Sequence, residues 1–249
     1  MNAKTNTMLA IMASILILSV TANAMLIPLN EIAKENSQAP GNSNAIDEDW
    51  NIQRHDFIHY ARPSGPGKNP KTACYVLIGA KWPTLSVNYV INPANPQSLS
   101  ESFITSTLSS SAEKWDNATS KELFNNSYQV DYNTQPGVRD SKNTLGFGNY
   151  GDNNVIAVTS LWVSNTGAIV EADVLFNTLY TWGDASIDPS LMDLDNIGTH
   201  ELGHTVGMGD VYNSACLSVT MFGYSGTGDI EKRTLESADI TGLRKIYGN

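Results

Sequence analysis

The sequence predicts one α/β or α+β domain with a mixed sheet. Short segments that alternate apolar and polar residues indicate strands, because the side chains of a strand point alternately to its two faces. Two longer segments place apolar residues three and four positions apart, which is typical of amphipathic helices. The first of these helices directly follows the first strand, where it can form the crossover between two parallel strands.

The predicted elements follow one another after residue 83. In order, they are a strand at 84–92, a helix at 99–115, three strands at 127–133, 154–163 and 167–177, a helix at 193–206 and a C-terminal helix within 234–249. The strands are rich in β-branched and aromatic residues. The second helix repeats an apolar or small residue every four positions, so that this face can pack on the sheet: Leu194, Gly198, Leu202 and Val206.

The N-terminal residues predict export. Residues 1–24 combine Lys4, an apolar run at 8–20 and the small-residue triplet ANA at 22–24, which is the pattern of a cleaved signal peptide. An uncleaved membrane anchor is the alternative, but the run is shorter than the ~20 residues of a spanning helix. Residues 25–71 are polar and rich in turn formers, so they form a linker, a tail or a prosegment. Residues 72–249 are a suitable length for one domain.

Composition narrows the class of partner. The formal net charge of −10 repels phosphate backbones and anionic lipids, so we expect no nucleic acid and, after signal cleavage, no membrane as partner. With only two cysteines, Cys74 and Cys216, the fold does not depend on a dense disulfide framework. We expect a secreted monomer.

The stretch THELGHTVGMGD at 199–210 predicts a zinc site. His200 and His204 are four residues apart on a predicted helix, so their rings project from consecutive turns of one face. Glu201 can stand beside a water that the metal makes acidic and take its proton. Gly207 can adopt a positive φ and end the helix, and the following turn can bring Asp210 back to the metal. The alternative is a helix with two surface histidines and a capping or solvated aspartate.

The motif H-E-x-x-H-x-x-G-x-x-D, followed by the turn SVTMFGYSG at 218–226, resembles the metzincin zinc endopeptidases, and in particular microbial matrixin-like members. The tail LESADITGLRKIYG and the strand IVEADVLFN are similar to the C-terminal helix and the cleft-bordering strand of matrixins. The resemblance covers residues 72–249. It implies a mixed, mostly parallel twisted sheet with two long helices and a C-terminal helix.

The resemblance also implies a role for each site residue. His200, His204 and Asp210 would bind zinc, Glu201 would be the general base, and Met221 would lie beneath the metal as a packing residue. In some metzincins a tyrosine two positions beyond that methionine contacts the metal or the oxyanion. Here the gap is three, so Tyr224 has that role or lines the specificity pocket.

Two features depart from the common family pattern. Most metzincins use histidine as third ligand, whereas Asp210 would add negative charge and reduce the Lewis acidity of the zinc, as in the snapalysin-type pattern. Vertebrate matrixins hold a second, structural zinc with histidines ahead of the catalytic helix. The only other histidines here, His55 and His59, lie in the polar segment and are expected to be solvated.

Two further features concern latency and calcium. A prosegment within 25–71 could cap the zinc with Asp47, Asp49 or Asp56, and no motif selects among them. The acidic loops at 151–154 and 182–195 offer oxygen ligands suited to calcium, which related enzymes usually bind, although such loops are often simple solvated turns.

The cysteines are expected to pair. Matrixins can use a prosegment cysteine on the zinc for latency, but the neighbours of Cys74, KTACYVLIG, indicate the start of a strand instead. In an exported chain we therefore predict a disulfide between Cys74 and Cys216.

Together these features predict a secreted zinc endopeptidase that cleaves protein or peptide substrates. The substrate would lie extended along the strand at 169–176. Two alternatives remain: a secreted binding module that keeps the metal without turnover, and a zinc hydrolase of a non-peptide bond. An intact Glu201 disfavours the first. Digestion of a peptide library would separate the second from a peptidase.

Overall fold

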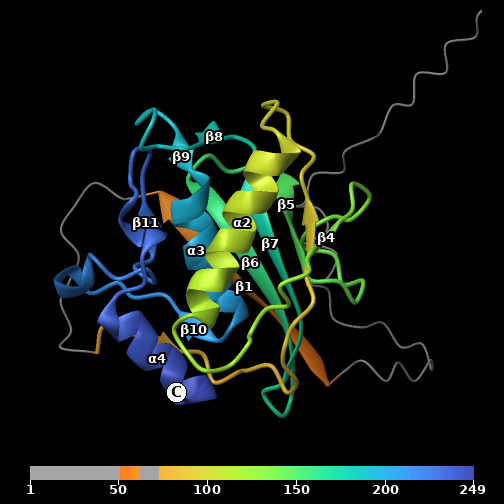
Figure 1. Ribbon diagram of the computed structural model, residues 1–249, viewed down its shortest axis with the longest axis vertical. Helices are drawn as coiled ribbons and strands as arrows, with labels where there is room; N and C mark the ends of the chain where they lie inside the picture. Colours follow the sequence, from red (N-terminus) through yellow and green to blue (C-terminus); the bar gives the residue numbers. More distant parts are fainter. Residues whose placement is uncertain (1–50, 62–72) are drawn as a thin grey trace, which may run out of the picture.

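The computed structural model describes residues 51–61 and 73–249, and its centre is a seven-stranded sheet (Figure 1). The strands lie in the order β11-β1-β6-β7-β5-β3-β4. Their bounds in chain order are Ile52–Ala61 (β1), Val90–Asn92 (β3), Gln129–Val130 (β4), Thr144–Gly148 (β5), Val155–Ser164 (β6), Ile169–Asn177 (β7) and Tyr224–Ser225 (β11). Two-stranded sheets join β2 (Val76–Leu77) to β10 (Met208–Gly209) and β8 (Trp182–Gly183) to β9 (Met192–Asp193).

The main sheet is mixed and mostly parallel, as predicted. Parallel pairing joins β4 to β3, β3 to β5, β5 to β7 and β1 to β11, whereas β6 is antiparallel to both β7 and β1. The crossover between β3 and its parallel neighbours carries the predicted helix. The strand expected to border the cleft, β7, lies between β6 and β5. That expectation is therefore wrong, because a strand paired on both sides has no free edge for a substrate.

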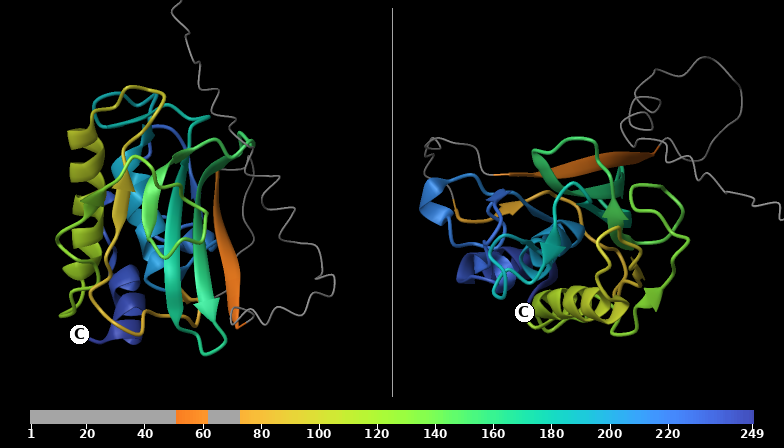
Figure 2. Two further views of the ribbon diagram at one scale, coloured as in Figure 1. Left: turned by 90° about the vertical axis from the view of Figure 1, so that its right-hand side faces the viewer. Right: turned by 90° about the horizontal axis from the view of Figure 1, so that it is seen from above.

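Three α-helices complete the described part of the fold: α2 (Glu101–Asp116), α3 (Leu194–Thr205) and α4 (Ser237–Tyr247). They lie where the apolar periodicity predicts them. Ser100 caps α2 by accepting from the Phe103 N–H, and Asp193 caps α3 by accepting from the Asn196 N–H. Helices α2 and α3 pack together on one face of the sheet (Figure 2).

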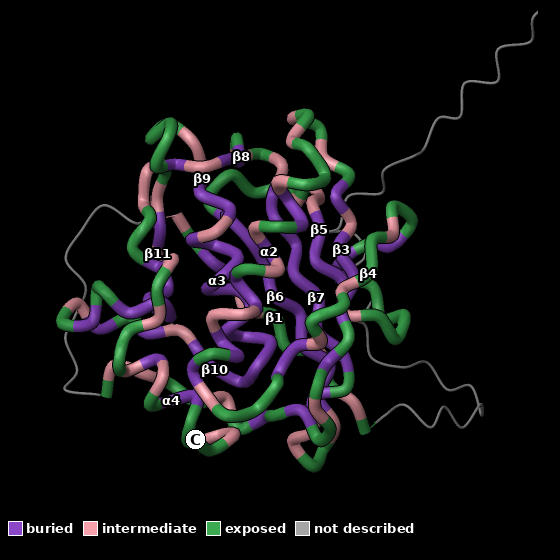
Figure 3. The backbone as a smooth tube through the Cα atoms, in the orientation of Figure 1, coloured by how far each residue is buried: buried purple, intermediate pink, exposed green. Residues whose placement is uncertain are grey.

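The core lies between this helical layer and the sheet. Its largest fully buried side chains include Trp115 of α2, Trp182 of β8, and Phe176 of β7. Helix α3 is buried along almost its whole length (Figure 3). A helix enclosed in this way holds its side chains in fixed positions, which suits a site that needs precise geometry.

Three strands of the main sheet were not predicted: β1, β5 and the two-residue β11, which lies in the segment expected to be a turn. Strand β5 has the sequence TLGFG, in which two glycines weaken the strand signal. Strand β1 lies in the segment expected to be a linker, tail or prosegment, and its alternation is weak because most of its side chains are exposed or half-buried. Main-chain pairing with β6 holds it in the sheet. The polar segment is thus in part a structural element.

In the part of the chain that the structure describes, no helix combines the length and apolarity needed to cross a bilayer. The predicted signal peptide and the aspartates Asp47 and Asp49 lie outside the described residues.

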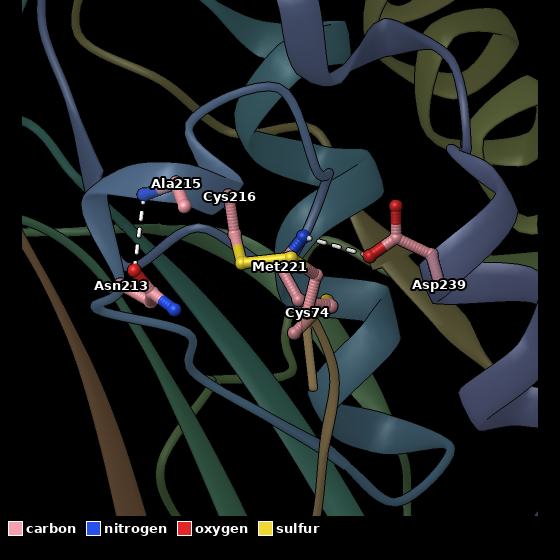
Figure 4. Close-up of a disulfide and its surroundings, with 6 residues drawn as sticks. All are labelled: Cys74, Asn213, Ala215, Cys216, Met221 and Asp239. Carbon is pink, nitrogen blue, oxygen red and sulfur yellow. Dashed lines mark hydrogen bonds between the residues drawn. A yellow bond between two sulfur atoms is a disulfide. The ribbon is translucent and has the colours of Figure 1, made fainter. Parts of the chain in front are cut away.

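Cys74 and Cys216 form the predicted disulfide (Figure 4). It joins the chain just before β2 to the 3-10 turn Ser214–Cys216, close to Met221. With its sulfur in the bridge, Cys74 has no thiol to place on a metal, so the disulfide also excludes the latency-thiol alternative.

We expect loss of this disulfide to destabilise the fold. The bridged residues are 142 positions apart. The chain-entropy model gives about 5 kcal/mol as an upper figure for closing so long a loop. Urea unfolding of Cys74→Ser, Cys216→Ser and the double variant should show similar losses, because each change removes the same cross-link. A double variant as stable as the wild type would contradict a structural role.

Candidate metal centre and active site

Helix α3 places His200 and His204 on one buried face. Their ring centroids are 4.8 Å apart and the rings are nearly perpendicular. Both side chains are fully buried. The separation of four residues brings them to consecutive turns, as the sequence predicts.

The chain turns back to these rings directly after the helix. Gly207 has a φ of +95°, and a Cβ there would collide with the Ala80 carbonyl, so the turn needs glycine. Three residues later, Asp210 Oδ1 lies 3.2 Å from His200 Nε2 and 3.6 Å from His204 Nε2. The structure thus brings together the three residues that the motif singles out.

The hydrogen bonds of the two rings direct their remaining nitrogens toward the aspartate. His200 Nδ1 donates to the Thr220 carbonyl at 2.7 Å, and His204 Nδ1 donates to the Met208 carbonyl at 2.9 Å. Each Nε2 therefore carries a lone pair. Burial, followed by the charge of Lys232, lowers the pKa of His200 to about 3, which keeps this ring neutral.

The three facing atoms fit a tetrahedral metal ion. His200 Nε2, His204 Nε2 and Asp210 Oδ1 are buried and have no hydrogen-bond partner. Such atoms are costly to bury unless something else satisfies them. Ligand atoms about 2.0–2.2 Å from a tetrahedral zinc lie about 3.3–3.6 Å from each other. The observed separations of 3.2 and 3.6 Å between Asp210 Oδ1 and the two histidine nitrogens are close to this range. Burial opposes ionisation of Asp210, but His204 and His200 hold the pKa of its carboxyl well below the usual range.

Glu201 lies beside this group of atoms, on the side facing the sheet. Its Oε2 accepts from the Thr159 hydroxyl of β6 at 2.5 Å. Its Oε1 lies 3.1 Å from His59 Nδ1. Burial raises the pKa of Glu201 to about 7. A carboxyl group with this pKa can both accept and release a proton near neutral pH.

Met221 is fully buried under the helix, within a turn that supports the histidines. Thr220, the residue before it, supplies the carbonyl that orients His200. The Asp239 carboxylate of α4 accepts from the Thr220 and Met221 N–H groups at 2.9 and 3.2 Å (Figure 4). The C-terminal helix therefore helps to fix the orientation of a candidate ligand. Met221 packs against Gly203 of α3, and its predicted place beneath a metal stays a prediction.

We expect Gly203→Ala to loosen this support. A Cβ at Gly203 would collide with the Met221 sulfur and the Trp115 ring. Overpacking typically costs about 1–3 kcal/mol, against a gain of about 1 kcal/mol in helix propensity, so the free energy of unfolding should fall by up to about 2 kcal/mol. Gly226→Ala is the control, since its Cβ would meet only Asp229 Oδ2 at 3.8 Å. Equal urea midpoints for the two variants would argue against this packing.

Two tyrosines lie next to Asp210. The Tyr212 hydroxyl donates to Asp210 Oδ2 at 3.2 Å, a contact that the sequence analysis missed. Tyr224 lies in β11, with its ring centroid 5.1 Å from that of Tyr212. Both tyrosines therefore border the site. Which of its two predicted roles Tyr224 has stays a prediction.

The expectation that His55 and His59 are both solvated is wrong for His59. His55 is exposed, but His59 is fully buried against the site. Its ring centroid lies 4.1 Å from that of His200, and its Nε2 lies 3.1 Å from the Lys232 ammonium, which also donates to the Phe222 carbonyl. No local pattern marks His59, because its partners come from distant parts of the chain.

Asp56, one of the three aspartates considered as a zinc cap, points away from the site. It accepts from the Ser160 hydroxyl at 2.7 Å and pairs with Arg54. Phe57, the next residue, instead stacks on the His204 ring with a centroid distance of 4.5 Å. The alternation of a strand explains the difference, since neighbouring side chains face opposite sides.

One of the two loops considered for calcium, at 182–195, is tied by ion pairs to Arg233. Arg233 donates to both Asp184 and Asp193. Asp152 and Asp188 accept hydrogen bonds from residues two positions further along. Calcium at these loops stays a prediction.

Helix α3, its return turn and the mixed sheet together have the arrangement expected for the H-E-x-x-H class of metal-dependent hydrolases. Comparison with known proteins identifies the family. The matrixin family model matches residues 81–248. Human matrix metalloproteinase-25 is 35% identical over 80 residues, which are 32% of this chain and 14% of that protein. The chain belongs to the matrixin family of zinc metallopeptidases.

Proposed function

We propose that this matrixin is a secreted zinc-dependent endopeptidase in which His200, His204 and Asp210 hold the zinc and Glu201 is the general base. The observation that carries the proposal is the convergence of three buried, unpartnered ligand atoms at zinc-like separations. With an aspartate in third position, the motif resembles that of the microbial Asp-ligand group, to which we propose that the chain belongs.

Each residue around the site has a separate role in the proposed hydrolysis. Zinc, when bound, supplies a Lewis acid that polarises the scissile carbonyl and acidifies water. Glu201 takes a proton from the attacking water and delivers it to the leaving amine. Thr159 orients Glu201 through its hydroxyl. Tyr212 holds the outer oxygen of Asp210, which leaves the inner oxygen for the metal.

We place the substrate cleft over α3, between β6 and β11, where β1 lies in this structure. Thr159 of β6 contacts Glu201, and Tyr224 of β11 borders Asp210 through Tyr212, so both strands flank the reacting position. An extended peptide placed there adds main-chain hydrogen bonds to each strand. Main-chain pairing with two strands favours a protein or peptide substrate over a small molecule.

Export is supported by two features of the chain. Residues 1–24 have the signal-peptide pattern. The Cys74–Cys216 disulfide is typical of proteins from oxidising compartments. We propose that the protein works outside the cell as a monomer.

The direct test is digestion of a peptide library and of casein by the full chain, at substrate concentrations up to saturation. We expect new internal cleavages detected by mass spectrometry, their loss with a zinc chelator, and their return when zinc is added. One zinc per chain should be found by elemental analysis. Zinc binding without cleavage of any peptide would favour the binding-module alternative.

A further inference from the structure

Strand β1 occupies the position described above for a substrate. It lies between β6 and β11, paired antiparallel to the first and parallel to the second. The ladder with β6 runs from Ile52 opposite Ser164 to Tyr60 opposite Val155, and Tyr60 also pairs with Tyr224. In Figure 2, β1 is the outermost long strand of the sheet.

This strand lies outside the part of the chain that the family model matches. The match to the matrixin model begins at residue 81, twenty positions after β1 ends. Most side chains of β1 are exposed or half-buried, and His59 is its only fully buried residue. Besides the main-chain ladder, side-chain contacts of Arg54, Phe57 and His59 hold this strand, and none of its other residues is fully buried. A strand held in this way can leave without unfolding the domain.

The inward-facing side chains of β1 cover the candidate zinc ligands. Phe57 stacks on His204 and His59 packs on His200, so β1 covers the rings of both candidate ligands. An extended peptide that covers these rings excludes any second peptide from them. The occupation is therefore direct and needs no conformational change elsewhere.

His59 also engages the proposed general base. An ammonium group can only donate, so Lys232 donates to His59 Nε2 and His59 Nδ1–H donates to Glu201 Oε1. With Thr159 on Oε2, both oxygens of Glu201 then have protein partners. His59 connects two buried charged residues, 142 and 173 positions away in the sequence.

We propose that residues 52–61 are an internal competitive inhibitor, lying extended in the substrate cleft and anchored there by His59 between Glu201 and Lys232. The proposal rests on the peptidase function proposed above and specifies its regulation. The anchoring group is the imidazole of His59. The sequence had suggested an aspartate or a cysteine thiol as the group that blocks the zinc site. Activity then depends on the fraction of molecules in which β1 has left the cleft.

Competitive occupation has a defined kinetic signature. A site that is open only part of the time shows an apparent KM raised by the inverse of the open fraction, while kcat at saturation is unchanged. Truncating a buried, charge-linked side chain weakens its anchoring enough to lower the apparent KM of His59→Ala by about 10-fold or more. His55→Ala is the matched control, because His55 is the same residue type on the same strand but exposed.

Hydrogen exchange measures the departure of β1 from the cleft without relying on catalysis. The amides of residues 52–61 should exchange faster in His59→Ala, whereas those of α3 and β7 should keep their protection. A synthetic peptide of residues 52–61 added to His59→Ala should inhibit competitively. The same peptide with alanine at the His59 position should be at least about 10-fold weaker, as for any lost buried anchor.

The outcomes separate the two proposals. A lower kcat at unchanged KM in His59→Ala would overturn inhibition and make His59 a positioning residue for Glu201. Unchanged KM and unchanged exchange would also overturn it. If neither the wild type nor His59→Ala cleaves any peptide, the peptidase function fails, while the exchange data still decide whether His59 anchors β1. An intact Cys74–Cys216 disulfide and a wild-type melting temperature for the rest of the domain show that the variant is folded.

Discussion

Replacing Glu201 with glutamine should abolish most peptidase activity while zinc stays bound. Glutamine keeps the shape of the side chain and can still accept from the Thr159 hydroxyl, but it cannot take a proton from water. Loss of a positioned general base typically costs about 10²–10⁴-fold in rate. The decrease should appear in kcat, because the peptide and the metal are still bound.

Elemental analysis after dialysis is the companion measurement, and one zinc per chain is expected in both proteins. Glu122→Gln provides the control, since it makes the same chemical change at an exposed site away from the metal centre. If Glu201→Gln digested casein at near the wild-type rate, Glu201 would not be the base, and the hydrolytic mechanism proposed here would be wrong.

The second large effect is expected at Asp210. Asp210→Ala leaves His200 and His204 as the only protein ligands, whereas catalytic zinc sites normally have three. Zinc affinity should fall by at least about 100-fold, beyond the ~10–100-fold that loss of an outer-shell partner causes. Activity should be lost with the metal. Asp210→His should restore binding, because it creates the commoner ligand set of three histidines.

Titration against a chelator of known affinity measures this effect directly. Asp140→Ala is the control, because Asp140 is exposed and far from the histidines in the fold. Unchanged zinc content in Asp210→Ala would remove this residue from the site. A protein that lost zinc but kept full activity would contradict metal-dependent hydrolysis.

Local geometry explains why much of the site could be predicted from the sequence. A helix fixes the relation between residues four positions apart, so the spacing of His200 and His204 already implies two rings on one face. A glycine three residues after the second histidine, followed by Asp210, encodes the return turn. The disulfide was also predictable, because an exported chain with two cysteines has few alternatives.

Strand β1 could not be predicted from the periodicity of the sequence. Periodicity detects a strand when one face is buried in the core, but β1 is held mainly by its main chain, and main-chain hydrogen bonds can form with almost any side chain. The glycines of β5 hide that strand in a similar way. The edge available to a substrate was also misplaced, since strand order in a sheet depends on pairing between distant segments.

The sequence by itself determined the class of site, the order of the main helices and the identity of the family, because each rests on residues close together along the chain or on a motif. Only the tertiary structure decided what surrounds that site. Thr159, Lys232, Asp239 and His59 reach it from separate elements, and their contacts depend on how those elements pack. Such contacts leave no local pattern, because close packing sets them through shape and burial, and neither is written in the spacing of residues.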